Sequence, residues 1–545
     1  MKQAMERPVD PLKDRRLAVF LAVTLVAVMG IRILVIALGP EAYLLGYLPD
    51  DAFYYFGMAR GFSSLGVWTF DGGFSLTSGF HPLHAYFNAL VMKFVSADAW
   101  RTMVGINLGV GWLLTSAGFG LMAAALYRRF GVWGVIGCLP VMLSQNILLN
   151  STNALESSWV ILASAVLIYS VQSQGTSRWW PAAALGAGLL GSFARIDFGG
   201  MPLILALCAW SSWRSVRDDA GKRRVRIAVM GLAGSIMATA GALVHHWLLF
   251  GDPISASARM KALWRNLAPE DGSLTLLEHL ISFKELPLGG TLTLALILWT
   301  GFLLVKLLRS PEPMLRENGW LGVAAALTVA FYLFLYAGSP GVQIWYTQNF
   351  TMSALWLMAS VVALSARKIK RRGFRIALAC GILLLGAVNL RATRAPTWPW
   401  MISMKAAGEK LAGRKDLGYI GSWNAGVLGY LQGRSVVNLD GLANDEIYPY
   451  IRQGSLACYL RERDIRYLAD FELMLLPGPT TSVRGGYADG VLMAAAVPVE
   501  VLAEPLDPGR PGTWWGSRLM LYRLDWEQAP PLDCDTVVRA NMSPP

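Results

Sequence analysis

Apolar segments of about 20 residues recur along most of this chain, separated by short polar stretches. An α-helix of that length crosses the hydrocarbon core of a bilayer. Hydrophobic residues make up 54% of the chain and charged residues only 15%, a balance that excludes an ordinary soluble fold. The pattern therefore predicts a polytopic α-helical membrane protein.

We expect about eleven membrane crossings. The apolar segments are residues 17–38, 100–126, 132–149, 157–171, 180–194, 198–213, 227–250, 288–307, 320–338, 345–366 and 374–390. Lys and Arg gather between them, as in the stretch 214–226, and such clusters mark the cytoplasmic side. The net charge of +12 thus reports topology, and no nucleic-acid partner is expected. The N-terminus is expected in the cytoplasm of a multi-pass protein of the inner (plasma) membrane.

An odd number of crossings places residues 391–545 outside the cytoplasm, whereas residues 1–390 form the membrane domain. Strands are expected at 417–420, 436–439 and 466–469, with helices at 425–432 and 445–463, which indicates an extracytoplasmic α/β domain. Cys458 and Cys534 can form a disulfide there if the compartment is oxidising. In Gly421–Gly426 the last glycine is not followed by the Lys and Ser/Thr of a phosphate loop, so nucleotide binding is not expected.

Two adjacent carboxylates, Asp50 and Asp51, follow the first apolar segment. Such a pair is costly to desolvate at a membrane surface, which favours a role in chemistry. Each carboxylate also raises the proton affinity of the other, as suits a general base near neutral pH. The alternative is that Asp50 caps the helix that follows and Asp51 adds charge to its first turn.

Further polar and aromatic residues fall on the same, extracytoplasmic side of the expected topology. They lie in the segments 77–84, 153–157, 195–197, 251–261 and 343–349. If these segments meet, they form a cavity at the membrane surface with carboxylates, cations and aromatic rings. Such a cavity suits an amphipathic substrate that carries a phosphate and an apolar tail.

Several short motifs resemble those of the GT-C glycosyltransferases, integral-membrane enzymes that use polyprenyl-phosphate sugars. The segment Asp50-Asp51-Ala52-Phe53-Tyr54 is similar to the Asp-Asp-Ala-Tyr segment of a bacterial branch with arabinofuranosyltransferase-like and mannosyltransferase-like members. Residues 77–83 resemble its Thr-Asn-Gly-Phe-Gln/His-Pro-Leu-Trp segment, with Ser78 and His84 in place of Asn and Trp. Residues 251–261 and 440–442 also resemble that branch.

The resemblance implies a glycosyltransferase that moves a sugar from a polyprenyl-phosphate donor to a glycan, lipid or protein acceptor, with inversion. It assigns Asp50 as general base and Asp51 as its helper, while cations stabilise the departing phosphate. The residues expected at the donor phosphate are Lys261, Arg259, Arg195 and His81. Those expected in the substrate pocket are Tyr54, Glu156, Trp345 and Tyr346. No cofactor is certain, and participation of a divalent cation stays open.

Several of these residues also have simpler interpretations. Arg195 can form a local ion pair with Asp197, and the two cations of segment 251–261 can pair with Glu270 or Asp271. Aromatic residues near the membrane surface are typical of the interfacial belt. That interpretation applies to Trp345, Tyr346, Trp398 and Trp400.

Two other functions also stay open. A transporter or flippase of lipid-linked glycans would use the acidic pair as an ion site. Transporters typically carry internal repeats and ionisable groups at mid-membrane depth, and neither is evident here. A catalytically inactive membrane scaffold would tolerate neutralisation of Asp50.

Overall fold

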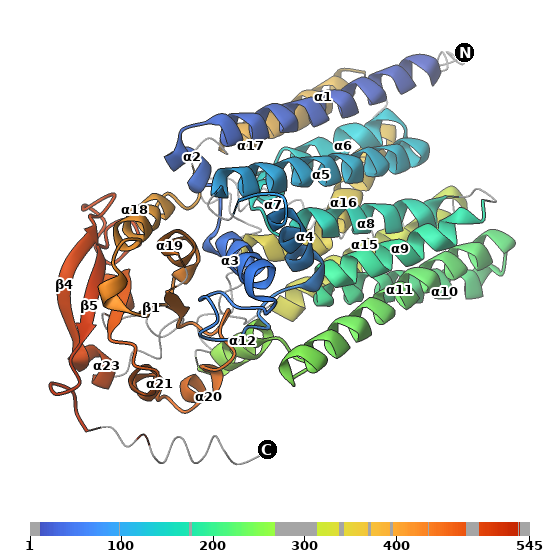
Figure 1. Ribbon diagram of the computed structural model, residues 1–545. Helices are drawn as coiled ribbons and strands as arrows, with labels where there is room; N and C mark the ends of the chain where they lie inside the picture. The colour runs from blue at the N-terminus through green and yellow to red at the C-terminus, as the bar shows by residue number, and fades with distance from the viewer. Residues whose placement is uncertain are drawn as a thin grey trace, which may run out of the picture.

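The computed structural model describes residues 11–96, 99–173, 177–267, 313–336, 343–368, 372–392, 396–433, 435–475, 490–531 and 534. Within these ranges the chain forms a bundle of long helices that meets a smaller α/β region at one end (Figure 1). The apolar segment at 288–307 lies outside the described residues.

Six stretches among the described residues are long and apolar enough to cross a membrane, or seven if one bent helix pair counts as a span. They lie in α1 (Pro11–Leu38), α5 (Trp100–Phe130), α10 (Gly200–Val216) with the 3₁₀ turn before it, α11 (Asp219–Phe250), α15 (Pro313–Tyr336) and α16 (Gln348–Lys368) with the turn before it. The helices α8 (Ser157–Gln172), α9 (Trp179–Ala194) and α17 (Arg372–Ala392) pack among them. The polytopic helical membrane fold is confirmed.

The sequence suggested one continuous helix over the apolar segment 132–149, and the structure does not form one. It forms α6 (Val132–Met142) and α7 (Gln145–Thr152), which are bent by 70° relative to each other. The Ser144 hydroxyl accepts a hydrogen bond from the Ile147 N–H at 3.4 Å and so caps the start of α7. This cap begins a second helix inside a segment that is uniformly apolar up to Leu143.

Short helices lie between the bundle and the α/β region (Figure 1). They are α2 (Glu41–Leu45), α3 (Asp50–Leu65), α4 (Pro82–Met92) and α12 (Ala256–Leu267). Pro49 precedes α3 in an extended conformation, and Pro82 is the first residue of α4, where its missing N–H costs nothing. The acidic pair therefore begins a helix at the boundary between the two regions.

The α/β region contains a five-stranded sheet with the order β2-β1-β3-β5-β4. Its strands are β1 (Ile420–Ser422), β2 (Val436–Asn438), β3 (Tyr467–Phe471), β4 (Ala496–Ala503) and β5 (Leu519–Leu524). The first three pair in parallel, and β5 pairs antiparallel with both β3 and β4. Helices of this region are α18 (Met401–Leu411), α19 (Ala425–Gln432), α20 (Tyr448–Arg452), α21 (Leu456–Glu462) and α23 (Gly490–Ala495). The expected α/β class is confirmed.

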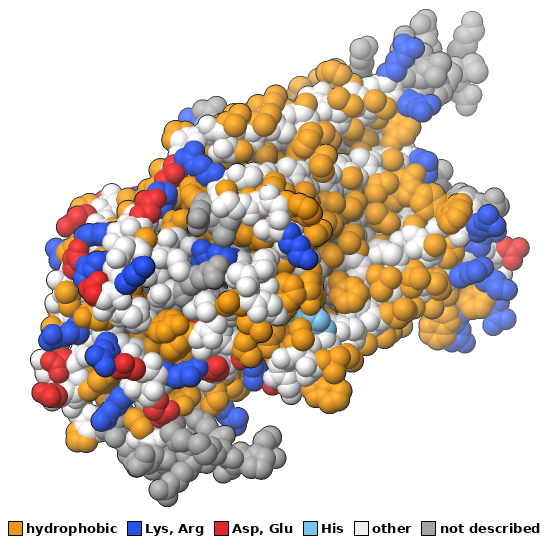
Figure 2. Space-filling model, viewed as in Figure 1, with side chains coloured by type: hydrophobic (Ala, Val, Ile, Leu, Met, Phe, Trp, Pro, Cys, Tyr) orange, Lys and Arg blue, Asp and Glu red, His pale blue; other side chains and the backbone are white. Residues whose placement is uncertain are grey.

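Side-chain type divides the surface into an apolar band and two charged ends. Hydrophobic side chains cover the bundle, whereas acidic and basic side chains mix on the α/β region (Figure 2). Lys and Arg gather again at the opposite end, near the connection of α10 and α11. That connection carries Arg214, Arg217, Lys222, Arg223, Arg224 and Arg226. An apolar band between charged ends fits a bilayer.

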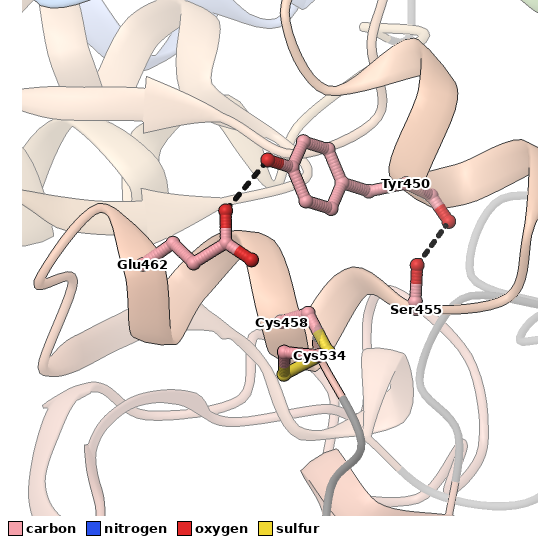
Figure 3. The surroundings of a disulfide bond; sticks show 5 residues. All are labelled: Tyr450, Ser455, Cys458, Glu462 and Cys534. Carbon is pink, nitrogen blue, oxygen red and sulfur yellow. Dashed lines mark hydrogen bonds between the residues drawn. A yellow bond between two sulfur atoms is a disulfide. The ribbon is translucent and has the colours of Figure 1, made fainter. Parts of the chain in front are cut away.

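A disulfide joins Cys458 of α21 to Cys534, with a Cα–Cα distance of 5.5 Å (Figure 3). Nearby, the Tyr450 hydroxyl donates to the Glu462 carboxylate at 2.7 Å, and the Ser455 hydroxyl donates to the Tyr450 carbonyl at 3.1 Å. The bond spans 76 positions of the chain, so it fastens the C-terminal part of the α/β region to α21.

Candidate functional site

A cavity of about 910 Å³, part of it open to solvent, lies where α3 meets the α/β region. Asp50 and Asp51 line it together with Lys261 of α12. Six tryptophans also line it, and we call it the tryptophan cavity. They are Trp264, Trp345, Trp398, Trp400, Trp423 and Trp514.

A second cavity, of about 530 Å³, is lined by most of the charged residues expected at the donor phosphate. We call it the cation cavity, and its polar residues include His81, Glu156, Arg195, Lys261 and Tyr346. The two cavities share the wall residues Asp51, Tyr54, Lys261, Trp345 and Leu442. They therefore adjoin, and Asp51 and Lys261 lie at their junction.

Asp50 lines only the tryptophan cavity and binds the start of α19. Its two carboxylate oxygens accept the backbone N–H groups of Gly426 at 2.9 Å and Val427 at 2.7 Å. Burial raises the pKa of Asp50 to about 7, although these two hydrogen bonds act in the opposite direction. The expected alternative, a cap on its own helix, is not what forms, since Asp50 caps α19 instead.

The loop between β1 and α19 donates consecutive backbone N–H groups to side-chain oxygens. Trp423 and Asn424 donate to Asp470 at 2.7 and 3.0 Å, and Ala425 donates to the Tyr54 hydroxyl at 3.0 Å. The next two N–H groups bind Asp50, as described above. These donors are therefore already used within the protein and are not available to a phosphate.

Arg195 is buried and held by two carboxylates. It donates to Glu156 at 2.8 Å and, through two nitrogens, to Asp197 at 2.9 and 2.8 Å. Its guanidinium also lies 4.4 Å from the centroid of the Tyr346 ring. The local ion pair with Asp197 is thus present, and the same side chain lines the cation cavity.

Lys261 projects from α12 toward Tyr346, to whose hydroxyl its ammonium group donates a hydrogen bond. Burial acts to lower the pKa of Lys261, but Tyr346 and the carboxylate of Asp51 outweigh it and raise the pKa above its usual value. Lys261 is therefore a charged ammonium group at the junction of the two cavities.

Arg259 lies on the same helix but lines neither cavity. It forms ion pairs with Asp252 at 3.0 Å and with Asp445 at 3.8 Å, and its guanidinium lies 5.0 Å from the centroid of the Tyr448 ring. The sequence-based alternative partners, residues 270–271, lie outside the described residues. Arg259 thus links α12 to the α/β region.

His81 lines the cation cavity, with its Nε2 4.0 Å from a carboxylate oxygen of Glu156. Its backbone N–H donates to the Tyr55 hydroxyl at 3.2 Å. Burial lowers the pKa of His81 to about 4, so the imidazole is neutral at pH 7. At that pH it can offer a hydrogen bond but no positive charge.

Trp398 and Trp400 line the tryptophan cavity. Their sequence-based interpretation as interfacial residues stays a prediction. The backbone N–H of Trp398 donates to the Gly46 carbonyl at 2.8 Å, which holds this segment against the chain before α3. Sequence reasoning also missed Trp264, Trp423 and Trp514, which come from distant segments. The only feature of the local sequence that could have pointed to them is a tryptophan next to polar or turn residues, as in Trp423-Asn424.

Within the described ranges, no group of three or more His, Cys, Asp and Glu side chains is placed to hold a metal ion. Whether a divalent cation is shared between a carboxylate and a substrate phosphate stays open.

The fold is similar to that of solved oligosaccharyltransferases. The chain resembles the apo crystal structure of the oligosaccharyltransferase from Archaeoglobus fulgidus, with a TM-score of 0.55 and 11% identity, over 88% of this chain and 73% of that one. The oligosaccharyltransferase AglB from the same organism, in complex with an inhibitory peptide and a dolichol-phosphate, matches with a TM-score of 0.53 and 12% identity. The match covers 94% of this chain and 75% of that one.

ArnT from Cupriavidus metallidurans, bound to undecaprenyl phosphate, matches with a TM-score of 0.49 and 14% identity, over 94% of this chain and 99% of that one. No protein-family model matches the sequence, and no curated protein matches it. At these identities the likeness concerns the fold alone.

Proposed function

We propose that this protein transfers a sugar from a polyprenyl-phosphate donor to an acceptor outside the cytoplasm, with inversion at the anomeric carbon. The observation that carries the proposal is the junction of two cavities, one containing Asp50 and the other lined by cations. A solved structure with the same fold is in complex with dolichol-phosphate, which supports a lipid-phosphate donor.

Asp50 is the proposed general base. Inversion places the attacking hydroxyl and the leaving phosphate on opposite faces of the sugar. Asp50 lines only the tryptophan cavity, so it faces the acceptor side when the phosphate occupies the cation cavity. Asp50 takes the hydroxyl proton, a bond forms from the acceptor oxygen to the anomeric carbon, and the phosphate oxygen leaves with its electron pair.

Lys261 is the proposed cation for the departing phosphate. It lies at the junction of the cavities, and its ammonium group remains charged at neutral pH. The charge of Arg195 is already balanced by Glu156 and Asp197. Arg195 therefore shapes the wall of the cation cavity and holds the Tyr346 ring, while Asp51 orients Lys261.

The proposed orientation places the α/β region outside the cytoplasm. The basic end of the bundle near the α10–α11 connection then faces the cytoplasm, as the positive-inside rule requires. The disulfide between Cys458 and Cys534 supports this orientation, because such bonds persist in oxidising compartments.

The function is tested with purified protein in liposomes that contain a radiolabelled polyprenyl-phosphate sugar and candidate acceptors. The wild type should transfer the label and release polyprenyl phosphate. Asp50→Asn should lower the turnover rate about 10²- to 10⁴-fold with donor binding preserved. Equal turnover by both proteins would remove the catalytic assignment, and movement of intact donor across the bilayer without transfer would favour a flippase.

A further inference from the structure

We infer that the tryptophan cavity binds neutral carbohydrate, so that the acceptor is a glycan. The identification of its occupant as the acceptor rests on the proposed function, whereas the binding of carbohydrate follows from the cavity itself. The cavity encloses about 910 Å³, a figure that includes space open to solvent.

The aromatic lining is the first observation. Trp400 and Trp514 stack with their ring centroids 6.2 Å apart and their planes at 21°, and both are partly exposed in the cavity. The ring centroids of Trp345 and Trp398 lie 6.0 Å apart on another part of the wall. Sugar rings have apolar C–H faces and hydroxyl edges, so flat aromatic walls with polar groups between them match their surface.

Two indole N–H groups in the same wall are the second observation. Trp264 and Trp423 are 3% and 2% exposed, and neither indole nitrogen has a hydrogen-bond partner among the described residues. A buried donor without a partner is uncommon and destabilising. Both residues line the tryptophan cavity, so an occupant that reaches these nitrogens would supply the acceptor that the described residues do not.

The charge of the cavity favours a neutral occupant. Asp50, Asp51 and Asp440 line it, whereas among the described residues its wall contains one Lys or Arg, Lys261, at the border with the cation cavity. Carboxylates accept hydrogen bonds from sugar hydroxyls and repel phosphate or carboxylate groups. An anionic acceptor is therefore disfavoured in this cavity.

A polypeptide that binds as an added strand is not consistent with the same wall. In this mode of recognition, an extended peptide pairs with the edge of a sheet. The edge strands here are β2 and β4, and no residue of either strand lines the tryptophan cavity. The cavity offers side-chain carboxylates and amides, including Gln343 and Asn424, in place of a backbone ladder.

The test uses full-length protein in detergent on an array of immobilised neutral oligosaccharides, anionic oligosaccharides and peptides. The wild type should bind neutral oligosaccharides. Trp400→Ala and Trp514→Ala should each weaken that binding at least tenfold, and Trp423→Phe, which keeps a ring but removes the N–H, should weaken it several-fold. Trp179→Ala is the matched control, because Trp179 is 68% exposed at the start of α9 and lines neither cavity.

Failure to bind any neutral oligosaccharide, preferential binding of peptides or anionic glycans, or equal loss in Trp179→Ala would overturn the inference. The thermal unfolding midpoint of each variant identifies those that fail to fold. If Trp423→Phe does not fold, the variants at the partly exposed Trp400 and Trp514 still test the inference. Binding of undecaprenyl phosphate is measured in parallel. Glycan binding without undecaprenyl-phosphate binding would contradict the proposed donor and leave the carbohydrate site intact.

Discussion

Asp50 and Asp51 are neighbours in the chain but act on different parts of the structure. Asp50 accepts the N–H groups that begin α19, more than 370 positions away, whereas Asp51 lies at the junction of the cavities and raises the pKa of Lys261. Such separate environments are typical of paired carboxylates with distinct roles.

The pH dependence of kcat/KM should report the pKa of Asp50. Burial raises this pKa to about 7, and a general base acts only when it is deprotonated. The value of kcat/KM should therefore fall about tenfold per pH unit below pH 7 and level off above it. Residual turnover of Asp50→Asn should lack this acidic limb, and an identical limb in that variant would assign the titration to another group.

Lys261 and Arg259 offer a matched pair of cations on one helix. Lys261→Ala should weaken binding of polyprenyl phosphate by about 1.5–3 kcal/mol, the range for a hydrogen bond to a charged group. Arg259→Ala should change that affinity little, because Arg259 is paired with Asp252 and Asp445 outside both cavities. Titration with undecaprenyl phosphate measures both variants, and a larger loss in Arg259→Ala would place the phosphate elsewhere.

Much of the cation cavity was predictable from the sequence, and much of the tryptophan cavity was not. The sequence pointed to Lys261, Arg195 and Tyr346 because polar residues on the outer side of apolar segments stand out. Arg259 looked equivalent to Lys261, since the direction of a side chain around a helix depends on packing. Trp423 and Trp514 could not be found, because their proximity depends on how the α/β region docks on α3.

At the level of secondary-structure elements, the contact of α3 with α19 positions the acidic pair. Gly426 makes this contact possible, since a Cβ there would lie 2.3 Å from the Asp50 carbonyl oxygen and 2.7 Å from its carboxylate. Asp470 at the end of β3 holds the preceding loop through Trp423 and Asn424. The sheet thereby fixes the start of α19 and, through it, the proposed base.

Gly426→Ala should displace α3 from α19. We expect it to lower the free energy of unfolding by about 1–3 kcal/mol, as in other overpacked sites, and to lower kcat more than donor affinity. Gly413→Ala is the control, because nothing lies within 4 Å of the added Cβ. Turnover assays and thermal unfolding of both variants check this, and wild-type kcat in Gly426→Ala would show that the contact does not position the base.

Element boundaries show where sequence reasoning reached its limit. Helix α19 begins and ends where expected, and β1 begins three residues after its expected start, because Lys415–Leu417 forms a 3₁₀ turn. The expected helix at 445–463 is divided into α20 and α21 around Gly454, which has a φ of +66°. Strands β4 and β5 were not predicted. In β4, Pro498 and two register shifts interrupt the alternation of side chains between the two faces of the sheet.

At the scale of the whole molecule, a bundle of apolar helices meets a folded α/β region at one end (Figure 1). Hydropathy alone predicted this division, since the length of each apolar segment is set by the bilayer. It could not predict that α3, α4 and α12 lie between the two parts, or that α3 and α12 line the site. Amphipathic helices of this kind lack the uniform apolar character of a crossing.

The disulfide should stabilise the α/β region. Cys534→Ser should lower its free energy of unfolding by about 2–5 kcal/mol, and a reductant should lower the unfolding midpoint of the wild type but not of the variant. Cys380→Ser is the control, since Cys380 is unpaired and lies in α17. If the reductant does not change the unfolding midpoint of the wild type, the disulfide does not stabilise the α/β region, and the proposed orientation loses support.

The most direct test of the central claim is a cryo-EM structure with a non-transferable phosphonate analogue of a polyprenyl-phosphate sugar. The account predicts that the phosphonate contacts Lys261 in the cation cavity while the anomeric carbon faces Asp50. Density for the phosphonate away from Lys261, or a sugar that points away from Asp50 with the phosphonate in place, would contradict it.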